Sequence, residues 1–364
     1  MKANLTKMEE VMLEKWKTTN IYQKLRETGK DKKKYILHDG PPYANGNIHI
    51  GHALNKILKD IIIKSKTLEG FDTPYIPGWD CHGLPIEHQV DKQLGPKKKG
   101  MSRHEIRKLC HEYAEKYVNI QREEFKRLGV FADWDSPYLT MDHSYEATII
   151  REFGRFVENG GVYKRKKPVL WCMSCETALA EAEVEYADET SPSVFVKFPH
   201  KSGIDDRIPP LKGKKVSIVI WTTTPWTLPA NLAVCLHPEF TYVAIEMNSD
   251  ILILAKDLLP SFLDKAGNPE VVTVAEFKGS LLEGVILSHP FINRDSLVVL
   301  GNYVTLDQGT GCVHTAPGHG EEDYETGLKY GLEIYSPVDS RGRFIDSIPY
   351  FAGMQVFEAN KFIN

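Results

Sequence analysis

Two histidines spaced three residues apart, His49 and His52, are the first feature of this sequence that could do chemistry. A loop rich in glycine and proline (residues 39–46) precedes them, and a segment of helical apolar periodicity follows. That order predicts a helix start, where unpaired N–H groups and the positive dipole end favour a polyphosphate. Gly51 between the histidines would let a ligand approach the backbone closely. Taken alone, the spacing fits a purely structural histidine pair equally well.

A second concentration of polar residues lies further along the chain. Residues 221–231 (WTTTPWTLPAN) place three hydroxyls before a proline, which is incompatible with a regular central strand. Residues 309–324 (GTGCVHTAPGHGEEDY) are similarly dense in small, turn-forming and polar residues. Glycines and prolines around His314 and Asp323 predict loops that shape a pocket. For the threonines, an edge strand entering a turn is the alternative.

One C-x-x-C pair, Cys172 and Cys175, could hold a metal ion, but it supplies only two of the four ligands of a structural zinc site. The sequence contains no second C-x-x-C. We therefore predict a pair of reduced thiols and no committed metal site, with zinc as the alternative.

The elements that must position these residues alternate in the first part of the chain. Residues up to about 30 form a polar amphipathic pattern, followed by a basic linker at 30–34. We predict strands at 35–38 and 73–76, and helices from about His49 to a stop at Gly70, at 103–128 and at 145–158. Strand, helix, strand with right-handed crossovers implies an α/β fold with a doubly wound parallel sheet.

After about residue 170 the pattern changes to short β-rich runs separated by turn signals, which predicts a compact β-barrel or sandwich. The runs are 193–198, 216–221, 242–247, 251–254, 271–277, 296–300 and 312–314. The predicted domains are an N-terminal helix and linker at 1–34, an α/β domain at 35–170 and a β-rich domain at 171–364.

Composition sets the broad class. The chain has 364 residues, 42% hydrophobic and 26% charged, as expected for two globular domains. Its apolar runs are far shorter than the roughly 20 residues of a membrane span, and residues 1–7 contain no apolar segment of a secretory signal. Six cysteines without an export signal indicate a cytoplasmic protein with reduced thiols.

The net charge of −4 gives no argument for nucleic-acid binding by the chain as a whole. Locally, lysine and arginine outnumber acidic residues between 91 and 129, and residues 164–167 are KRKK. These stretches fit either a solvated helix face or a patch that meets an RNA backbone.

Two segments, PPYANGNIHIGHALNK at 41–56 and GWDCHGLPIE at 78–87, resemble the signatures of class I aminoacyl-tRNA synthetases in the form typical of isoleucyl enzymes. The resemblance covers nearly all of the chain and is specific because both segments match. It implies the first half of a Rossmann-like catalytic domain with an inserted β-rich editing domain. It assigns catalysis to His49 and His52, ATP binding to these two with Asn45 and Gly51, and amino-acid binding to Gly40, Pro41 and Asp80. A cap or turn is the alternative role for Asp80 alone.

The threonine-rich and His–Asp segments resemble the editing insertion of isoleucyl, valyl and leucyl synthetases. The resemblance assigns the editing pocket to Thr222, Thr223, Thr224, Asn231, His314 and Asp323. It places His314 near the scissile ester, as a catalytic residue, and makes Asp323 the carboxylate that captures the ammonium group. Without a nucleophile–base arrangement in the sequence, we expect a positioned water to attack the ester.

The implied function is ligation of isoleucine to tRNA(Ile), using ATP with Mg²⁺, together with hydrolysis of mischarged Val-tRNA(Ile). One methylene is worth only about 1–3 kcal/mol of discrimination, which is why a second site is needed. The resemblance further implies a cytoplasmic monomer without membrane partners. The Lys-Met-Ser-Lys-Ser loop of these enzymes is not in the sequence, so we expect a truncated form with little activation on its own. A stand-alone editing deacylase and an inactive remnant are the alternatives.

Overall fold

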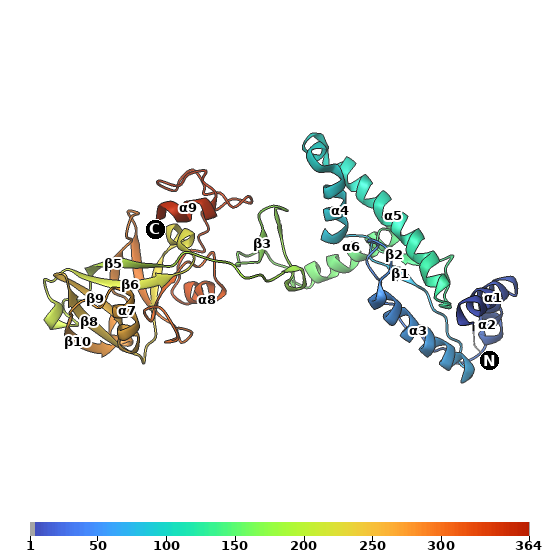
Figure 1. Cartoon of the computed structure of the whole chain (residues 1–364), viewed down its shortest axis with the longest axis horizontal. Helices are drawn as coiled ribbons and strands as arrows, with labels where there is room; N and C mark the ends of the chain where they lie inside the picture. Colours follow the sequence, from blue (N-terminus) through green and yellow to red (C-terminus); the bar gives the residue numbers. More distant parts are fainter. Residues whose placement is uncertain (1–3, 364) are drawn as a thin grey trace. The chain divides into compact units, whose positions relative to one another are not determined.

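The computed structural model describes residues 4–363 and divides into two compact units, Met1–Tyr163 and Lys164–Asn364 (Figure 1). The ends of the predicted ranges 1–34 and 171–364, and part of the N-terminal segment considered as a signal, lie outside the described residues. Among the described residues, no helix has the length and apolar character needed to cross a membrane.

Helices dominate the first unit. Its elements are α1 (Leu5–Thr18), α2 (Ile21–Gly29), α3 (Ile50–Leu68), β1 (Gly78–Trp79), α4 (Leu84–Leu94), a 3-10 turn (Gly95–Gly100), α5 (Arg103–Arg127), β2 (Tyr138–Leu139) and α6 (His143–Glu158). The helices predicted from about His49, over 103–128 and over 145–158 are confirmed as α3, α5 and α6. The N-terminal pattern is two helices rather than one, because Asn20 adopts a left-handed conformation with φ of 48° between α1 and α2.

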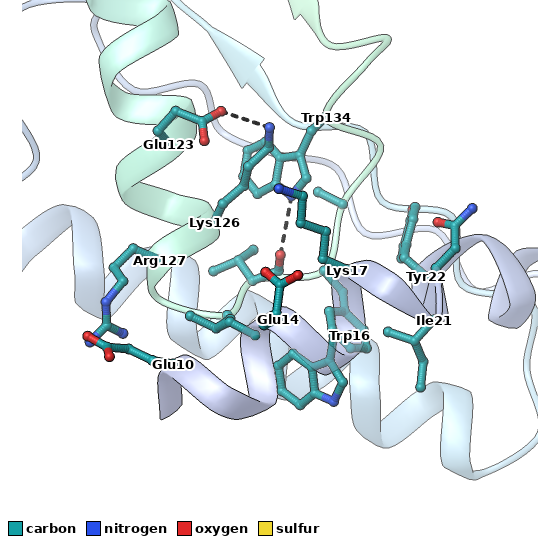
Figure 2. Close-up of a pocket in the computed structure, with 16 residues that line it drawn as sticks. Glu10, Glu14, Trp16, Lys17, Ile21, Tyr22, Glu123, Lys126, Arg127 and Trp134 are labelled. Carbon is teal, nitrogen blue, oxygen red and sulfur yellow. Dashed lines mark hydrogen bonds and ion pairs between the residues drawn. The ribbon is translucent and has the colours of Figure 1, made fainter. Parts of the chain in front are cut away.

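The two N-terminal helices pack on the end of α5 and on the segment that follows it. The Trp16 and Phe131 rings meet edge to face at 5.0 Å, and the Tyr22 hydroxyl lies 3.3 Å from the backbone carbonyl of Tyr75. A pocket of about 550 Å³ remains between these elements. Figure 2 shows Trp16, Tyr22 and Trp134 around it, with Lys126 held by Glu123 at 2.8 Å.

The parallel strands of the first unit are shorter than the sequence predicts. β1 pairs with β2 in parallel, and single parallel bridges join Lys34 to Asp72 and Tyr43 to Asp80. The predicted strands at 35–38 and 73–76 are wrong: neither segment is a strand, and only the single bridge between Lys34 and Asp72 lies beside them. Pro74 and Pro77 explain the second case, since proline cannot donate to a ladder. The ladder begins only after Pro77, at β1.

The second unit is built on a mixed sheet. Its elements are β3 (Trp171–Cys172), β4 (Thr177–Ala178), β5 (Val194–Ser202), β6 (Val216–Thr222), β7 (Ala233–Leu236), β8 (Thr241–Met247), β9 (Asp250–Ala255), α7 (Leu259–Lys265), β10 (Val272–Lys278), β11 (Ile286–Ser288), β12 (Asp295–Leu300), β13 (Cys312–Thr315), α8 (Glu321–Lys329) and α9 (Val356–Ile363). Short 3-10 turns join them at Glu181–Glu183, Pro209–Leu211, Pro225–Ala230, Lys256–Leu258 and Gly279–Leu282.

Nine strands of the described chain form one sheet in the order β10-β8-β9-β6-β5-β11-β12-β7-β13. All seven predicted runs correspond to strands of this sheet, whereas β7 and β11 were not predicted. The sheet curls, so that its edge strand β13 packs against β6. An apolar core fills the curl, with Ile218, Val234 and Leu287 each 0% exposed. This curl brings the end of β6, where the threonine string begins, beside His314 on β13.

Candidate functional sites

His49 and His52 stand at the start of α3, as the sequence predicts. His49 is the N-cap residue, and its Nδ1 accepts a hydrogen bond from the Gly51 N–H at 3.1 Å. The His49 N–H in turn donates to Nδ1 of His52 at 3.2 Å. Because Nδ1 of each ring accepts a hydrogen bond, Nε2 is the ring nitrogen that carries a proton. Burial, with His49 and Lys56 nearby, lowers the pKa of His52, so this ring is neutral at pH 7.

Gly51 is required by the histidine pair itself. A Cβ at this position would lie 2.9 Å from Cε1 of His49, closer than carbon atoms approach without a shift. The glycine therefore lets the His49 ring fold over the first turn of α3. The ring centroids of His49 and His52 are consequently only 4.0 Å apart, and the two side chains form one unit at the helix start.

The loop before α3 is held by α5. Gln121, which is 0% exposed, donates through Nε2 to the carbonyl oxygens of Tyr43 and Gly46 at 3.1 and 2.8 Å. Its own oxygen accepts the Trp79 indole N–H at 3.0 Å. Nearby, Oδ1 of Asn45 accepts the Tyr113 hydroxyl at 2.8 Å. The loop is therefore anchored, and Asn45 is committed to α5 rather than free to bind a nucleotide through Oδ1.

Asp80 lies directly beside this loop. Its N–H donates to the carbonyl of Pro42 and its carbonyl accepts the Ala44 N–H, both at 2.8 Å. Oδ1 accepts the His82 N–H at 3.3 Å and lies 3.5 Å from the Thr140 hydroxyl. No cation among the described residues forms an ion pair with this half-buried carboxylate. The backbone ladder thus places Asp80 beside Pro42, which directly follows Gly40 and Pro41, the predicted amino-acid-binding residues.

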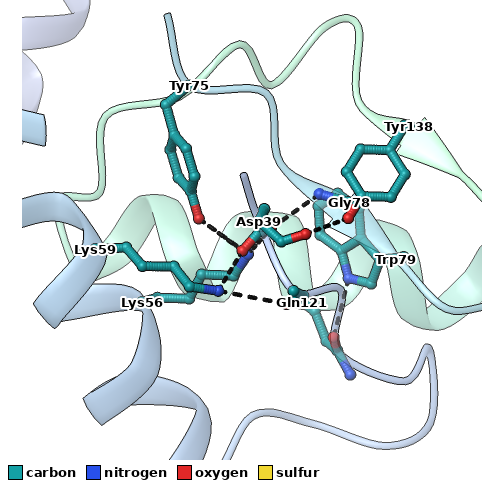
Figure 3. A network of polar contacts seen from close by, with 9 residues as sticks. Asp39, Lys56, Lys59, Tyr75, Gly78, Trp79, Gln121 and Tyr138 are labelled. Carbon is teal, nitrogen blue, oxygen red and sulfur yellow. Dashed lines mark hydrogen bonds and ion pairs between the residues drawn. The ribbon is translucent and has the colours of Figure 1, made fainter. Parts of the chain in front are cut away.

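Sequence reasoning missed the most buried charged cluster of the unit. Asp39 and Lys56 are each 1% exposed and form an ion pair, and Lys59 reaches the same carboxylate at 2.6 Å. The Tyr75 hydroxyl and the Gly78 N–H also donate to Asp39, at 2.8 and 3.0 Å. Figure 3 shows these groups converging on Asp39. The only signal in the sequence was two lysines, three residues apart, within an apolar helix pattern.

The cluster keeps its charges because attraction balances desolvation. Burial alone would raise the pKa of Asp39, but Lys56, Lys59 and the Gly78 N–H outweigh it and the pKa is lowered. Burial lowers the pKa of Lys56 despite the attraction of Asp39. The network joins α3 to the segment that ends at Asp39 and to β1. It therefore fixes the distance between the histidine pair and the segment that carries Asp80.

In the second unit, a cavity of about 260 Å³ opens where β6 and β13 approach each other. Of the predicted editing residues, Thr222, Thr224, His314 and Asp323 line it. Thr223 is exposed and does not line it, and Asn231, which is 0% exposed, lies behind His314. The lining residues that the sequence did not assign include Thr227 and His319, although both lie inside the segments that were singled out.

His314 is held rigidly on the wall of this cavity. Asn231 Nδ2 donates to its Nδ1 at 2.9 Å, and its Nε2 lies 2.8 Å from the Thr227 hydroxyl, which donates to the Thr224 carbonyl at 2.8 Å. The ring therefore carries its proton on Nε2. Burial lowers the pKa of His314 to about 3, which keeps it neutral. Both ring nitrogens are occupied, so the geometry favours a positioning role for His314 over proton transfer.

Asp323 lies in the first turn of α8. One oxygen accepts the Ala316 N–H at 2.9 Å. Burial raises the pKa of Asp323 to about 6, with the Ala316 N–H opposing and Glu322 adding to the shift. A carboxylate that burial makes costly to ionise gains most from a bound cation. The arrangement suits an ammonium group.

The cysteine pair sits in the β3–β4 hairpin. The Cys175 N–H donates to Sγ of Cys172 at 3.3 Å, and this hydrogen bond lowers the pKa of the Cys172 thiol. No group of three or more His, Cys, Asp or Glu side chains within residues 4–363 is arranged to hold a metal ion. Zinc at the pair stays an untested alternative.

Comparison with known proteins places this geometry in a family. The family model of class I tRNA synthetases (I, L, M and V) matches residues 11–344. The chain belongs to this family. Two proteins named isoleucine–tRNA ligase, from Geobacter sulfurreducens and Syntrophotalea carbinolica, are 60% and 54% identical to it over 99% and 100% of its length. The chain spans 39% of the length of each.

Membership of the class I family confirms the predicted α/β fold class and the resemblance on which it rested. A solved ternary complex of LeuRS with tRNA, from Agrobacterium radiobacter, matches 98% of this chain and 46% of that chain at 17% identity, with a TM-score of 0.41. That similarity is too low to fix the arrangement by itself. The individual site residues stay predictions, which the geometry above now constrains.

Proposed function

We propose that the chain is the N-terminal part of an isoleucine–tRNA ligase and supplies half of its activation site. The single observation that carries this is the ladder from Pro42 to Ala44, which sets the Asp80 carboxylate beside the loop that ends in the histidine pair. The isoleucine carboxylate attacks the α-phosphate of ATP, pyrophosphate leaves, and isoleucyl-adenylate forms. The adenylate then transfers isoleucine to tRNA(Ile).

Each residue has a physical role in that reaction. Asp80 holds the isoleucine ammonium group by a charge-assisted hydrogen bond. His49 and His52 donate from Nε2 to phosphate oxygens, and the N-terminus of α3 adds its dipole. Gly40 and Pro41 shape the amino-acid pocket. Mg²⁺ enters with ATP as part of the substrate and neutralises phosphate charge.

The cavity of the second unit is proposed to hydrolyse Val-tRNA(Ile). Asp323 captures the valine ammonium group, while Thr222 and Thr224, which line the same cavity, supply hydroxyls. Hydrolysis there removes the errors that a single methylene of discrimination leaves. Asn231 acts through His314, and Thr223 lies outside the cavity. We propose that the protein works in the cytoplasm as a monomer.

A stand-alone editing protein is the competing function, and ligand binding separates the two. Isothermal titration of this chain with isoleucyl-sulfamoyl-adenosine, a stable adenylate analogue, should give binding that Asp80→Asn and His52→Ala each weaken about tenfold or more. His88→Ala, at an exposed position of α4, is the control and should bind unchanged. Absence of binding would contradict the activation half of the proposal.

The hydrolytic half is tested by deacylation under excess enzyme. The chain should hydrolyse Val-tRNA(Ile) much faster than Ile-tRNA(Ile), and Asp323→Asn should abolish the difference. Thr223→Val is the matched control, because the exposed Thr223 side chain should tolerate the change that Thr222→Val does not. Equal hydrolysis of both substrates by the unsubstituted chain would contradict the editing role.

A further inference from the structure

Positive charge concentrates where the chain turns from α4 into α5. Residues 95–108 (GPKKKGMSRHEIRK), here called the hairpin tip, contain six lysine or arginine residues and one acidic residue, although the whole chain has a net charge of −4. All six of these basic side chains are exposed. Figure 1 shows α4 and α5 side by side, with the turn at the end of the hairpin away from β1 and β2. The tip therefore presents a positive field to solvent.

Nearby acidic residues leave most of this charge uncompensated. Two of the six cations are paired, Lys98 with Asp91 on α4 and Lys108 with Glu112 at 3.8 Å. Glu105, the one acidic residue of the tip, accepts hydrogen bonds at 2.7 Å from the residue that caps α5. The other four cations form no ion pair with any residue of the range 4–363: Lys97, Lys99, Arg103 and Arg107.

The hairpin tip is held in one conformation. Gly95 ends α4 with a φ of 52°, and a 3-10 turn leads into α5. Ser102 and Glu105 form a capping box at the start of α5. Further along the hairpin, Ile86 of α4 lies in one buried cluster with Ala114 of α5. Because the backbone is fixed before a partner arrives, binding at the tip costs little conformational entropy.

The arrangement of the arginines is unfavourable without an anion. Arg103 and Arg107 lie four residues apart in the first two turns of α5, on the same side of the helix and about 6 Å apart along its axis. Like charges at this spacing repel each other, and the positive end of the helix dipole also disfavours them. A phosphate group would reverse both effects, and the guanidinium fork matches its oxygens.

The composition of the tip favours an RNA backbone over a membrane. Met101 is the only large apolar residue between positions 95 and 105, and it is half-buried, so the tip lacks the apolar face that enters a lipid surface. The tip contains no Phe, Tyr or Trp on which unpaired bases could stack. Its remaining means of binding is charge, which suits the phosphates of a helical stem.

We propose that the hairpin tip is a docking surface for the phosphate backbone of tRNA. The inference rests on the proposed ligase function, in which tRNA(Ile) is a substrate, and adds a place where its backbone is held. The contacts come from the four unpaired cations. They orient the tRNA without reading a base, so the choice of tRNA(Ile) is made elsewhere.

The experiment measures binding of fluorescently labelled tRNA(Ile) to the full 364-residue chain, by anisotropy, between about 50 and 200 mM KCl. The variant Lys97→Gln/Lys99→Gln/Arg103→Gln/Arg107→Gln should bind about tenfold more weakly, or worse, at the lower salt concentration. The slope of log K against log[salt] should become shallower by about 0.9 for each phosphate contact that is lost. Titration with isoleucyl-sulfamoyl-adenosine should match the parent, which shows that the variant is folded.

Two controls separate contact from net charge. Lys7→Gln/Lys15→Gln removes two exposed charges from α1, as Lys97→Gln/Lys99→Gln does from the tip, and should leave the slope unchanged. Lys98→Gln should also leave the slope unchanged, because its ammonium group is already paired with an acidic residue.

Three results would overturn the assignment. A slope of the four-residue variant within about 0.9 of the parent slope, with the adenylate analogue still bound, would refute the docking surface and leave the ligase function standing. Binding of phosphatidylglycerol vesicles through the tip, with tRNA binding unaffected, would assign the surface to a membrane instead. A parent chain that does not bind the adenylate analogue would contradict the proposed function, and the assignment of the tip to tRNA(Ile) with it.

Discussion

Removal of Lys56 tests whether the buried charge network supports the first unit. Lys56→Met keeps most of the apolar stem but removes the ammonium group, which lies over the Phe125 ring. The Asp39 carboxylate is then left with Lys59, Tyr75 and Gly78. Breaking a buried ion pair costs about 3–5 kcal/mol. We expect about 3 kcal/mol here, since one cation remains. Asp39→Asn should cost about 4–5 kcal/mol, because it leaves two neighbouring ammonium groups near a neutral amide.

The assay is native-state hydrogen exchange of peptides within α3, which reports this unit alone. A loss of about 3 kcal/mol corresponds to exchange faster by roughly two powers of ten. The double variant Asp39→Asn/Lys56→Met should cost less than the sum of its parts by about 2 kcal/mol, because the two side chains are in contact.

The matched control is Lys66→Met on the same helix. Its partner Glu69, at 2.8 Å, is 48% exposed, so the solvent screens the pair and the change should cost far less than Lys56→Met. The reasoning is refuted if Lys56→Met costs no more than Lys66→Met, or if the two network substitutions are additive.

Three further predictions concern the two sites. Gln121→Leu should lower the free energy of unfolding by about 2–4 kcal/mol, since two buried loop carbonyls lose their donor. Hydrogen exchange of the amides of residues 43–48 should become faster, and unchanged exchange there would contradict the prediction. Gly51→Ala should displace the His49 ring and shift its imidazole NMR signals. The loss of the cap should lower the free energy of unfolding by about 1 kcal/mol. Unchanged imidazole signals would contradict the prediction. Because the pKa of Asp323 is raised to about 6, its carboxyl is increasingly protonated below pH 6. Binding of 3′-deoxy-3′-(valylamino)adenosine, an amide analogue of the aminoacyl ester, should therefore weaken by about tenfold per pH unit below pH 6 and level off above it; affinity that does not change over about one pH unit below 6 would contradict this.

Asp323 should contribute the opposite pH trend to the stability of the chain itself. A carboxyl whose pKa is higher in the folded state than in the unfolded state stabilises the fold at low pH and loses that contribution as pH rises through about 6. The buried histidines His314, His319 and His289 contribute with the other sign, because burial lowers their pKa values to about 3, 4 and 4 and the unfolded chain therefore binds protons that the folded chain does not. Asp323→Asn should remove the Asp323 contribution alone, so that between about pH 4 and pH 6 the free energy of unfolding of the variant rises more steeply with pH than that of the parent in urea unfolding followed at the second unit; parallel curves would contradict this.

The apolar periodicity of the sequence correctly predicted the long helices of the first unit and most strands of the second. The stripes on α3, α5 and α6 are long enough to outweigh local ambiguity, and the β-rich runs of the second unit are bounded by clear turn signals. It failed where the chain is short or interrupted. The predicted strand at 73–76 ignored Pro74 and Pro77, and α4 was hidden because Gly83 and Pro85 resemble a turn although proline is well tolerated in a first helical turn.

For the sites, too, the sequence predicted some features and missed others. Residue types and resemblance pointed to the histidine pair, to Asp80 and to the wall of the cavity. They could not show that Asp39 gathers two lysines from α3, because that contact depends on how the helix packs. Nor could they separate His314 from His319, which are five residues apart in one segment. Only the hydrogen bonds reveal that one ring is committed and the other is not.

The central claim is that the loop, the start of α3 and the Asp80 segment form one binding site for an aminoacyl adenylate. Amide and imidazole NMR spectra of the chain, recorded with and without isoleucyl-sulfamoyl-adenosine, test it most directly. We predict that the shifts concentrate at Gly40, His49, His52 and the residues flanking Asp80. Binding that moves signals elsewhere and leaves both histidines unchanged would contradict the account.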